Sequence, residues 1–321
     1  MKSVWEYGLS THVGPVKKVN EDRSFFRYST QGKGQDYAIA LMADGMGGYQ
    51  AGDKASELAI SKIKQWWDQN ITHIVSGRLS LSASIESLKA AFFEINEELI
   101  QISYQDGVMA GTTLSVILFH QNQFGICHVG DSRIYQISAK KICSTRKMSE
   151  YAYEITQPLS DQCLPTQVLT ENACNQKPVN SSNLEGMIQL THDHSWVETE
   201  VQKGRLNREE ARVHPRRNVL LQCLGIEPGL DVFVQEGYSN EGDIFLLCSD
   251  GFYSLFSDSS IENLILSRTS KKVNLQSITD ELVELANQQK DAADNISAML
   301  LQKIALDRKG LRDFFTNLIK A

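Results

Sequence analysis

The stretch that most constrains the fold is residues 37–56, YAIALMADGMGGYQAGDKAS. It begins with an unbroken apolar run over residues 37–43, a pattern typical of a strand buried on both faces. The run stops at Asp44, glycines follow at positions 45, 47 and 48, and a helical pattern begins near Gly52. A carboxylate at the end of such a strand is held on rigid backbone, and glycines let the next backbone approach whatever it binds. Alternatively, Asp44 only caps backbone amides at a strand–turn–helix junction.

The composition argues against several classes of protein. The chain is 41% hydrophobic and 22% charged, which is ordinary for a globular protein, and its net charge of −7 argues against nucleic-acid binding through bulk charge. No run approaches the roughly 20 apolar residues of a membrane span, and residues 1–14 lack the apolar stretch of a signal peptide. Six cysteines form no CxxC pair and are interpreted as reduced thiols. We therefore expect a cytoplasmic protein without a membrane span or a nucleic-acid partner.

Alternating and helical apolar patterns divide most of the chain into short elements. The loop between the first two expected strands carries two lysines and the pair Glu21 and Asp22, which form either a solvated face or half of an anion-plus-metal site. Asn207 and Glu210 have the spacing of a capping box. The expected strands are 3–9, 24–28, 37–43, 112–119, 124–129, 134–137, 187–190, 232–238, 244–249 and 296–304, and the expected helices are 51–67, 84–103, 195–203, 259–267, 274–289 and the amphipathic tail 306–321.

Further aspartates share the setting of Asp44. Asp250 ends a buried strand and is followed by glycine, and Asp294 comes just before another strand. Asp131 lies in the sequence Gly130-Asp131-Ser132-Arg133, which interrupts a strand and predicts a bulge that redirects a side chain. Several aspartates at the mouths of apolar strands indicate that oxygen ligands line one edge of a sheet core.

Such a set of carboxylates points to metal chemistry. Like charges that lie close together raise one another's pKa unless cations neutralise them. All-oxygen ligation favours Mg²⁺ or Mn²⁺ and argues against zinc, which prefers cysteine and histidine. Two such ions can clamp both oxygens of an in-line displacement at phosphorus and lower the pKa of a bound water. The residues by themselves therefore indicate a metal-assisted phosphoester hydrolase.

Eight motifs in a fixed order strengthen this interpretation. The motifs are VNED at 19–22, ADGMGG at 43–48, GTT at 111–113, VGDSR at 129–133, LTHDHS at 190–195, EEARVHPRRN at 209–218, LLCSDG at 246–251 and DNIS at 294–297. In these motifs the chain resembles bacterial members of the PP2C-type (PPM) family of metal-dependent protein serine/threonine phosphatases. The resemblance covers the chain from Gly8 to about Leu301.

The resemblance implies an α+β fold, a four-layer α-β-β-α sandwich in which antiparallel helices flank two antiparallel β-sheets. It also implies two catalytic Mn²⁺ or Mg²⁺ ions at one end of the sandwich. Asp44 would bridge both ions, the Gly45 carbonyl would bind one, and Asp250 and Asp294 would complete the pair. A water activated between the ions would attack the phosphate.

The resemblance assigns roles to other residues as well. Glu21 and Asp22 would lie in or near the metal shell, mostly through water, and Asp131 would help to hold a weaker third metal. Lys17 stands where many members have a phosphate-binding arginine, and a lysine keeps the charge but loses the bidentate fork. Residues 196–218 match a mobile flap beside the site, where Arg216 and Arg217 are either a solvated pair or a contact for an acidic or phosphorylated substrate.

Some positions depart from the family pattern. Met46 stands where some members carry a histidine proposed to protonate the leaving group, so water is the alternative donor. Tyr49 replaces a histidine common in bacterial relatives. These changes concern substrate affinity and leaving-group protonation, not metal binding.

Other candidate residues have simpler interpretations. His12, His192 and His194 are either bases, ligands or structural side chains, and the structural interpretation is favoured for the two that flank Asp193. Ser132 lacks the His/Asp partners of a nucleophile, and Cys248 in a buried strand is expected to be an inert packed thiol.

The predicted function is hydrolysis of phosphoserine and phosphothreonine in a protein substrate, the target of a serine/threonine kinase. A catalytically weak regulatory module and a small-molecule phosphatase on the same scaffold are the alternatives. The predicted domain organisation is a phosphatase domain over residues 1–305, with a polar insertion at about 139–186, followed by a C-terminal amphipathic helix over 306–321. A monomer is expected.

Overall fold

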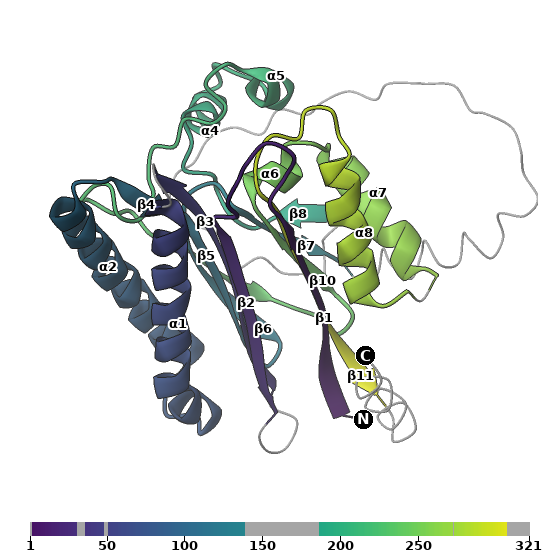
Figure 1. Cartoon of the computed structure of the whole chain (residues 1–321). Helices are drawn as coiled ribbons and strands as arrows, with labels where there is room; N and C mark the ends of the chain where they lie inside the picture. The colour runs from purple at the N-terminus through teal and green to yellow at the C-terminus, as the bar shows by residue number, and fades with distance from the viewer. Residues whose placement is uncertain (1, 31–35, 48–50, 139–185, 272, 307–321) are drawn as a thin grey trace, which may run out of the picture.

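The computed structural model describes residues 2–30, 36–47, 51–138, 186–271 and 273–306. The predictions for the 139–186 insertion up to residue 185, for Tyr49 and for the tail from residue 307 onward lie outside the described residues. The described parts form two antiparallel sheets and two sets of helices (Figure 1).

The strands divide between the two sheets by hydrogen bonding. Sheet A has the order β1-β11-β10-β7-β8, and sheet B has the order β2-β3-β5-β6-β9, with the short β4 paired to β3. The strands of sheet A are β1 (Lys2–His12), β7 (Arg133–Ile137), β8 (Met187–Gln189), β10 (Ile244–Cys248) and β11 (Ile296–Leu306). Those of sheet B are β2 (Asp22–Thr30), β3 (Asp36–Gly47), β4 (Ala110–Thr112), β5 (Leu114–His120), β6 (Gln123–Val129) and β9 (Phe233–Tyr238).

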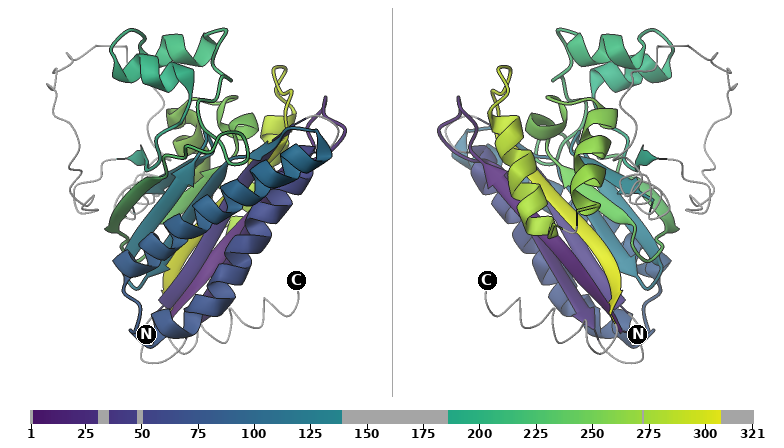
Figure 2. Two further views of the ribbon diagram at one scale, coloured as in Figure 1. Left: turned by 90° about the vertical axis from the view of Figure 1, so that its left-hand side faces the viewer. Right: turned by 90° about the vertical axis from the view of Figure 1, so that its right-hand side faces the viewer.

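Two pairs of helices cover the outer faces of the two sheets, so the molecule has four layers, as the two side views show (Figure 2). The two long helices, residues 51–75 and 81–106, pack on sheet B. Helices 258–269 and 275–287 pack on sheet A, together with the short helix 250–253 that follows β10. The helices are α1 (Ala51–Val75), α2 (Leu81–Asp106), α4 (Trp196–Gln202), α5 (Arg208–Val213), α6 (Asp250–Tyr253), α7 (Asp258–Thr269) and α8 (Leu275–Asn287).

Strand β3 shows why the central apolar run lacks polar alternation. Tyr37, Ile39 and Leu41 point to the core shared with α1 and α2, whereas Ala38 and Met42 point to the core between the two sheets. Side chains alternate across a strand, so a strand covered on both faces must be apolar at every position. The predicted four-layer α+β sandwich is therefore confirmed.

Three details near the motifs quoted above differ from the sequence prediction. Asp22 lies inside β2 and not in the preceding loop, and β3 runs past Asp44 to Gly47 because its last residues pair with β4. Residues 130–132 are not a bulge within one strand: β6 belongs to sheet B and β7 to sheet A, so these residues carry the chain from one sheet to the other.

The predicted helices that fall within the described residues are correct in position, but their ends differ: α1, α2 and α7 are longer than predicted, and α4 and α8 are shorter. α1 continues to Val75 because Ile74 extends its buried face by two turns beyond the predicted end. Asn207 and Glu210 form the predicted capping box at the start of α5. Asp250 differs from Asp44 in its local structure, since it begins helix α6 while Asp44 continues in a strand.

Candidate metal centre

Asp44 is held by the backbone around it. Its carbonyl accepts hydrogen bonds from the Thr113 amide at 2.8 Å and the Thr112 hydroxyl at 3.0 Å, and its amide donates to Thr113 Oγ1 at 2.9 Å. These contacts fix the main chain at the junction of β4 and β5. The carboxylate of Asp44 thus lies on an immobile part of sheet B.

Asp22 joins the two sheets at the same end. It lies opposite Asp44 in the β2–β3 register and is only 3% exposed. Ser249, which follows β10 of sheet A and directly precedes Asp250, donates its hydroxyl to Asp22 Oδ2 at 2.9 Å. The amide of Ser297 in β11 donates to that same serine hydroxyl at 3.1 Å. A short chain of hydrogen bonds therefore runs from sheet B into sheet A beneath the acidic residues.

Asp294 and Lys17 lie at the outer side of this group. Lys17 Nζ is 2.9 Å from Asp294 Oδ1 and 4.0 Å from Glu21 Oε2. Asn295 shapes the loop that carries Lys17 and Glu21: its side chain accepts from the Glu21 amide at 2.8 Å and donates to the Val13 and Val19 carbonyls. The loop between β1 and β2 is thereby attached to the start of β11.

The Gly45 region depends on close backbone packing. A Cβ atom on Gly45 would lie 2.1 Å from the carbonyl oxygen of Gly52, and a Cβ atom on Gly52 would lie 2.6 Å from Glu21 Oε1. A side chain at either position would therefore push the start of α1 or the Glu21 carboxylate away from β3. The glycines of this motif let the loop, the strand and the helix meet at one point.

Electrostatics set these acidic groups apart from the rest of the protein. Burial raises the pKa of Asp22 to about 7, against hydrogen bonds from Ser297 and Ser249 that lower it. Burial and then the charges of neighbouring aspartates raise the pKa of Asp44 well above its usual range. Burial and then Asp250 do the same for Asp131.

Opposing effects set the pKa values of Asp250 and of the neighbouring Lys17. Burial and the charge of Asp294 raise the pKa of Asp250, while a hydrogen bond with Asp44 lowers it. Burial lowers the pKa of Lys17, but the hydrogen bond and charge of Asp294 outweigh it and raise the value overall. Two carboxyl groups in hydrogen-bond contact cannot both ionise unless a cation lies near them.

The residues present fit a hard divalent cation. Oxygen atoms make up the whole donor set, and in the described structure the buried Asp22 Oδ1 has no hydrogen-bond partner. No three acidic, histidine or cysteine side chains of the described residues converge in a ready-made metal-binding arrangement. The fit therefore rests on the pairwise contacts and on the mutual repulsion of the aspartates.

The remaining candidate residues have structural contacts. His12 Nδ1 accepts from the Gly14 amide at 2.9 Å, and His194 Nδ1 accepts from the Gly130 amide at 3.2 Å. The Ser132 hydroxyl is hydrogen-bonded to Thr113 at 2.8 Å. Burial raises the pKa of Cys248, as expected for an inert thiol. These contacts favour the structural interpretation for all four residues.

Comparison with known proteins identifies the family. The chain matches the model described as Protein phosphatase 2C over residues 16–301, and it belongs to that family. It is 28% identical over 298 residues to the "Serine/threonine phosphatase stp" of Listeria monocytogenes, covering 90% of this chain and 96% of the relative. It is 28% identical over 302 residues to "Protein phosphatase PhpP" of Streptococcus pneumoniae, covering 92% and 96%. The predicted family and enzyme class, a protein phosphatase of the PP2C type, are confirmed.

Solved structures confirm the fold. The serine/threonine phosphatase of S. agalactiae superposes with a TM-score of 0.70 at 23% identity, covering 94% of this chain and all of the other. The catalytic domain of the serine/threonine protein phosphatase PstP, a complex with two manganese ions, superposes with a TM-score of 0.64 at 23% identity, covering 95% and 100%.

Sequence reasoning missed three positioning residues. Asn295, Ser249 and Thr113 hold the acidic residues through hydrogen bonds that cross between elements far apart in the chain. Each lies inside a quoted motif, DNIS, LLCSDG or GTT. Their position within those motifs was the available signal, because their own residue types are ordinary in turns and caps.

The raised pKa of Asp22 predicts how the free energy of unfolding depends on pH. The folded pKa of Asp22 is about 7, above its usual 3.8, so between these values the folded state holds a proton that the unfolded state has released. Without metal, this carboxyl therefore lowers the free energy of unfolding as pH rises from about 4 to 7. Asp22→Asn removes the effect, so in EDTA the variant should be more stable than wild type by a few kcal/mol at pH 8 and lose that advantage at pH 4.5.

Urea denaturation at the two pH values measures this difference. Asp291→Asn, at an exposed position, is the matched control, and the difference between its free energy of unfolding and that of wild type should be the same at both pH values. An equal difference between Asp22→Asn and wild type at both pH values would contradict the assignment.

Proposed function

We propose that the protein hydrolyses phosphoserine and phosphothreonine in protein substrates, with two Mn²⁺ or Mg²⁺ ions held by Asp44, Asp250, Asp294 and the Gly45 carbonyl. The observation that supports this most strongly is the position of these aspartates at one end of the sandwich, where Asp250 and Asp294 raise the pKa of Asp44 and Asp294 raises that of Asp250. Two relatives named above as serine/threonine phosphatase and protein phosphatase, and a PstP structure with two manganese ions, support the same activity.

The chain's own residues would orient the substrate and balance the charge of its phosphate group. When bound, the ions would supply Lewis-acid activation of water and neutralise the phosphoryl oxygens. Lys17, beside Asp294, would contact the phosphate, and Glu21 and Asp22 would hold water molecules around the ions. Asp131, two residues before β7, and Asp250, two residues after β10, would hold a weaker third ion. With Met46 in place of a histidine, water would protonate the leaving group.

The substrate and setting are part of this proposal. The substrate would be a protein phosphorylated by a serine/threonine kinase, and the enzyme would act as a cytoplasmic monomer. None of the helices that the structure describes combines the length and apolar character needed to cross a membrane. The insertion at about 139–186 and the tail 306–321 would extend a phosphatase domain that is complete over 1–305.

Metal-ligand variants test the activity. Asp44→Asn, Asp250→Asn and Asp294→Asn should each lower the turnover of p-nitrophenyl phosphate by at least about 10²-fold, because each removes charge from the ion that activates water. Wild-type activity should need Mn²⁺ and disappear in EDTA. The control Asp291→Asn should keep wild-type turnover.

Near-normal Mn²⁺-dependent turnover in all three variants would refute the two-metal proposal. Absence of activity in the wild type under any metal would instead favour the regulatory module, and hydrolysis of metabolites in preference to phosphopeptides would favour the small-molecule phosphatase.

Lys17 variants test the phosphate contact. Lys17→Ala should raise KM for a phosphopeptide more than it lowers kcat, because the contact is present in both the ground state and the transition state. Lys17→Arg should restore or improve KM, since a guanidinium offers a bidentate fork. Steady-state kinetics at saturating Mn²⁺ measure both, and an unchanged KM in the alanine variant would rule the contact out.

A further inference from the structure

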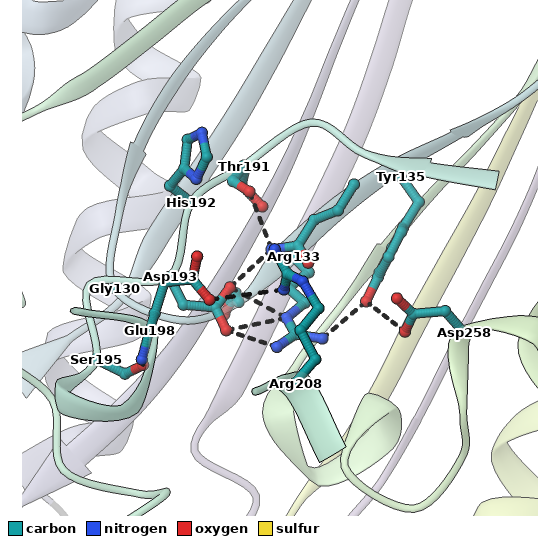
Figure 3. A network of polar contacts seen from close by, with 12 residues as sticks. Gly130, Arg133, Tyr135, Thr191, His192, Asp193, Ser195, Glu198, Arg208 and Asp258 are labelled. Carbon is teal, nitrogen blue, oxygen red and sulfur yellow. Dashed lines mark hydrogen bonds and ion pairs between the residues drawn. The ribbon is translucent and has the colours of Figure 1, made fainter. Parts of the chain in front are cut away.

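Arg133 and Asp193 form a buried ion pair outside the proposed ligands (Figure 3). The pair lies beside the acidic group, since the charges of both residues act on Asp131. Arg133 Nε lies 3.0 Å from both carboxylate oxygens of Asp193, and Nη2 lies 2.7 Å from Oδ2. The side chains are 17% and 5% exposed, and Gln189 donates a further hydrogen bond to Asp193 at 2.8 Å. A buried pair gives little net stability compared with apolar side chains of the same volume. Its geometry is therefore more informative than its energy.

The guanidinium of Arg133 also connects β7, the strand that follows Asp131, to α6, the helix that begins at Asp250. Its carbon lies 3.7 Å from the centroid of the Tyr253 ring, on the short helix α6 that begins at Asp250. In the β7–β10 register Arg133 lies opposite Cys248, so Asp131 and Asp250 each lie two residues beyond the same pair, at the same end of sheet A. The side chain of Arg133 thus fixes the helix of one aspartate against the strand that follows the other.

The third connection runs to the flap, residues 196–218. Asp193 belongs to the flap root, residues 191–195, which ends at Ser195, the N-cap of α4. The His194 amide donates to the Gly130 carbonyl at 2.7 Å, directly before Asp131.

Within the flap, Glu198 on α4 pairs with Arg208 on α5 at 3.6 Å (Figure 3). This pair joins the two flap helices to each other, and the hydrogen bond between His194 and Gly130 attaches the flap root to the segment that carries Asp131.

We propose that Arg133 is a positioning residue, which holds the flap root and helix α6 in a fixed arrangement around Asp131 and Asp250. Metal binding and flap order would then depend on one guanidinium. The metal part of this inference rests on the proposed function, because it takes Asp131 and Asp250 to be metal ligands. The flap part does not depend on metal or on activity.

Arg133→Lys is the main test, because a lysine keeps the charge but loses the fork and the planar face. Titration calorimetry with Mn²⁺ should show that the affinity for the weaker, third ion falls by about 10-fold. In EDTA, tryptic cleavage after Arg212 and Arg216 in the flap, followed by mass spectrometry, should become about fivefold faster. Tyr253→Leu should weaken Mn²⁺ binding in the same direction, and Tyr253→Phe, which keeps the ring, should restore it.

Arg268→Lys is the matched control. Arg268 is similarly enclosed, with its side chain 20% exposed, and pairs with Glu281 between α7 and α8, away from the acidic group. It should lower the melting temperature without changing Mn²⁺ affinity or flap cleavage. If Arg133→Lys and Tyr253→Leu behave like this control, Arg133 only stabilises the fold and the proposal is wrong. If wild type binds no Mn²⁺, the proposed function fails, and unchanged flap cleavage in Arg133→Lys would still overturn the positioning role.

Discussion

Mutual repulsion among carboxylates packed at one end of the sandwich is the constraint on which this structure depends. Asp22 and Asp44 lie opposite each other on the neighbouring strands β2 and β3, and Asp250, which follows β10 of sheet A, is in hydrogen-bond contact with Asp44. Burial and neighbouring charge both raise their pKa values. A protein can keep such a group together only if the backbone leaves it no room to separate and if protons or cations neutralise it.

The four-layer fold supplies the rigid backbone. Apolar cores lie on both sides of each sheet, and each acidic residue of the centre lies in a strand or within a few residues of one. Hydrogen bonds from Ser249, Thr113 and Asn295 then join the ends of elements that are far apart in the sequence. The centre is therefore a product of both sheets, and neither sheet could form it alone.

Much of this could be predicted from sequence because it depends on local pattern. The apolar runs before Asp44 and Asp250 predicted buried strands, and the order of the motifs predicted the family and the sandwich. The exchange of sheets at residues 130–132 could not be predicted, because periodicity shows that a strand is present but not which strand it pairs with. The pairing of Arg133 with Asp193 was hidden for the same reason: the two residues are sixty positions apart and meet only when β7 and β8 pair.

Boundaries were also less predictable than elements. The polar residues around Asp22 predict a loop, yet the pairing with β3 draws Asp22 into β2. β3 passes Asp44 because β4 offers its last residues a partner. In both cases tertiary hydrogen bonding overrides the local preference of the residues for a turn.

The central claim is that divalent cations replace protons in the acidic centre. Titration calorimetry of Mn²⁺ into the metal-free protein near pH 6.5, in buffers of different ionisation enthalpy, measures bound ions and released protons together. The account predicts about two ions per chain or more, with release of protons, because burial raises the pKa of Asp22 to about 7 and its carboxyl is partly protonated before metal binds. Absence of Mn²⁺ binding, or binding without proton release, would contradict it.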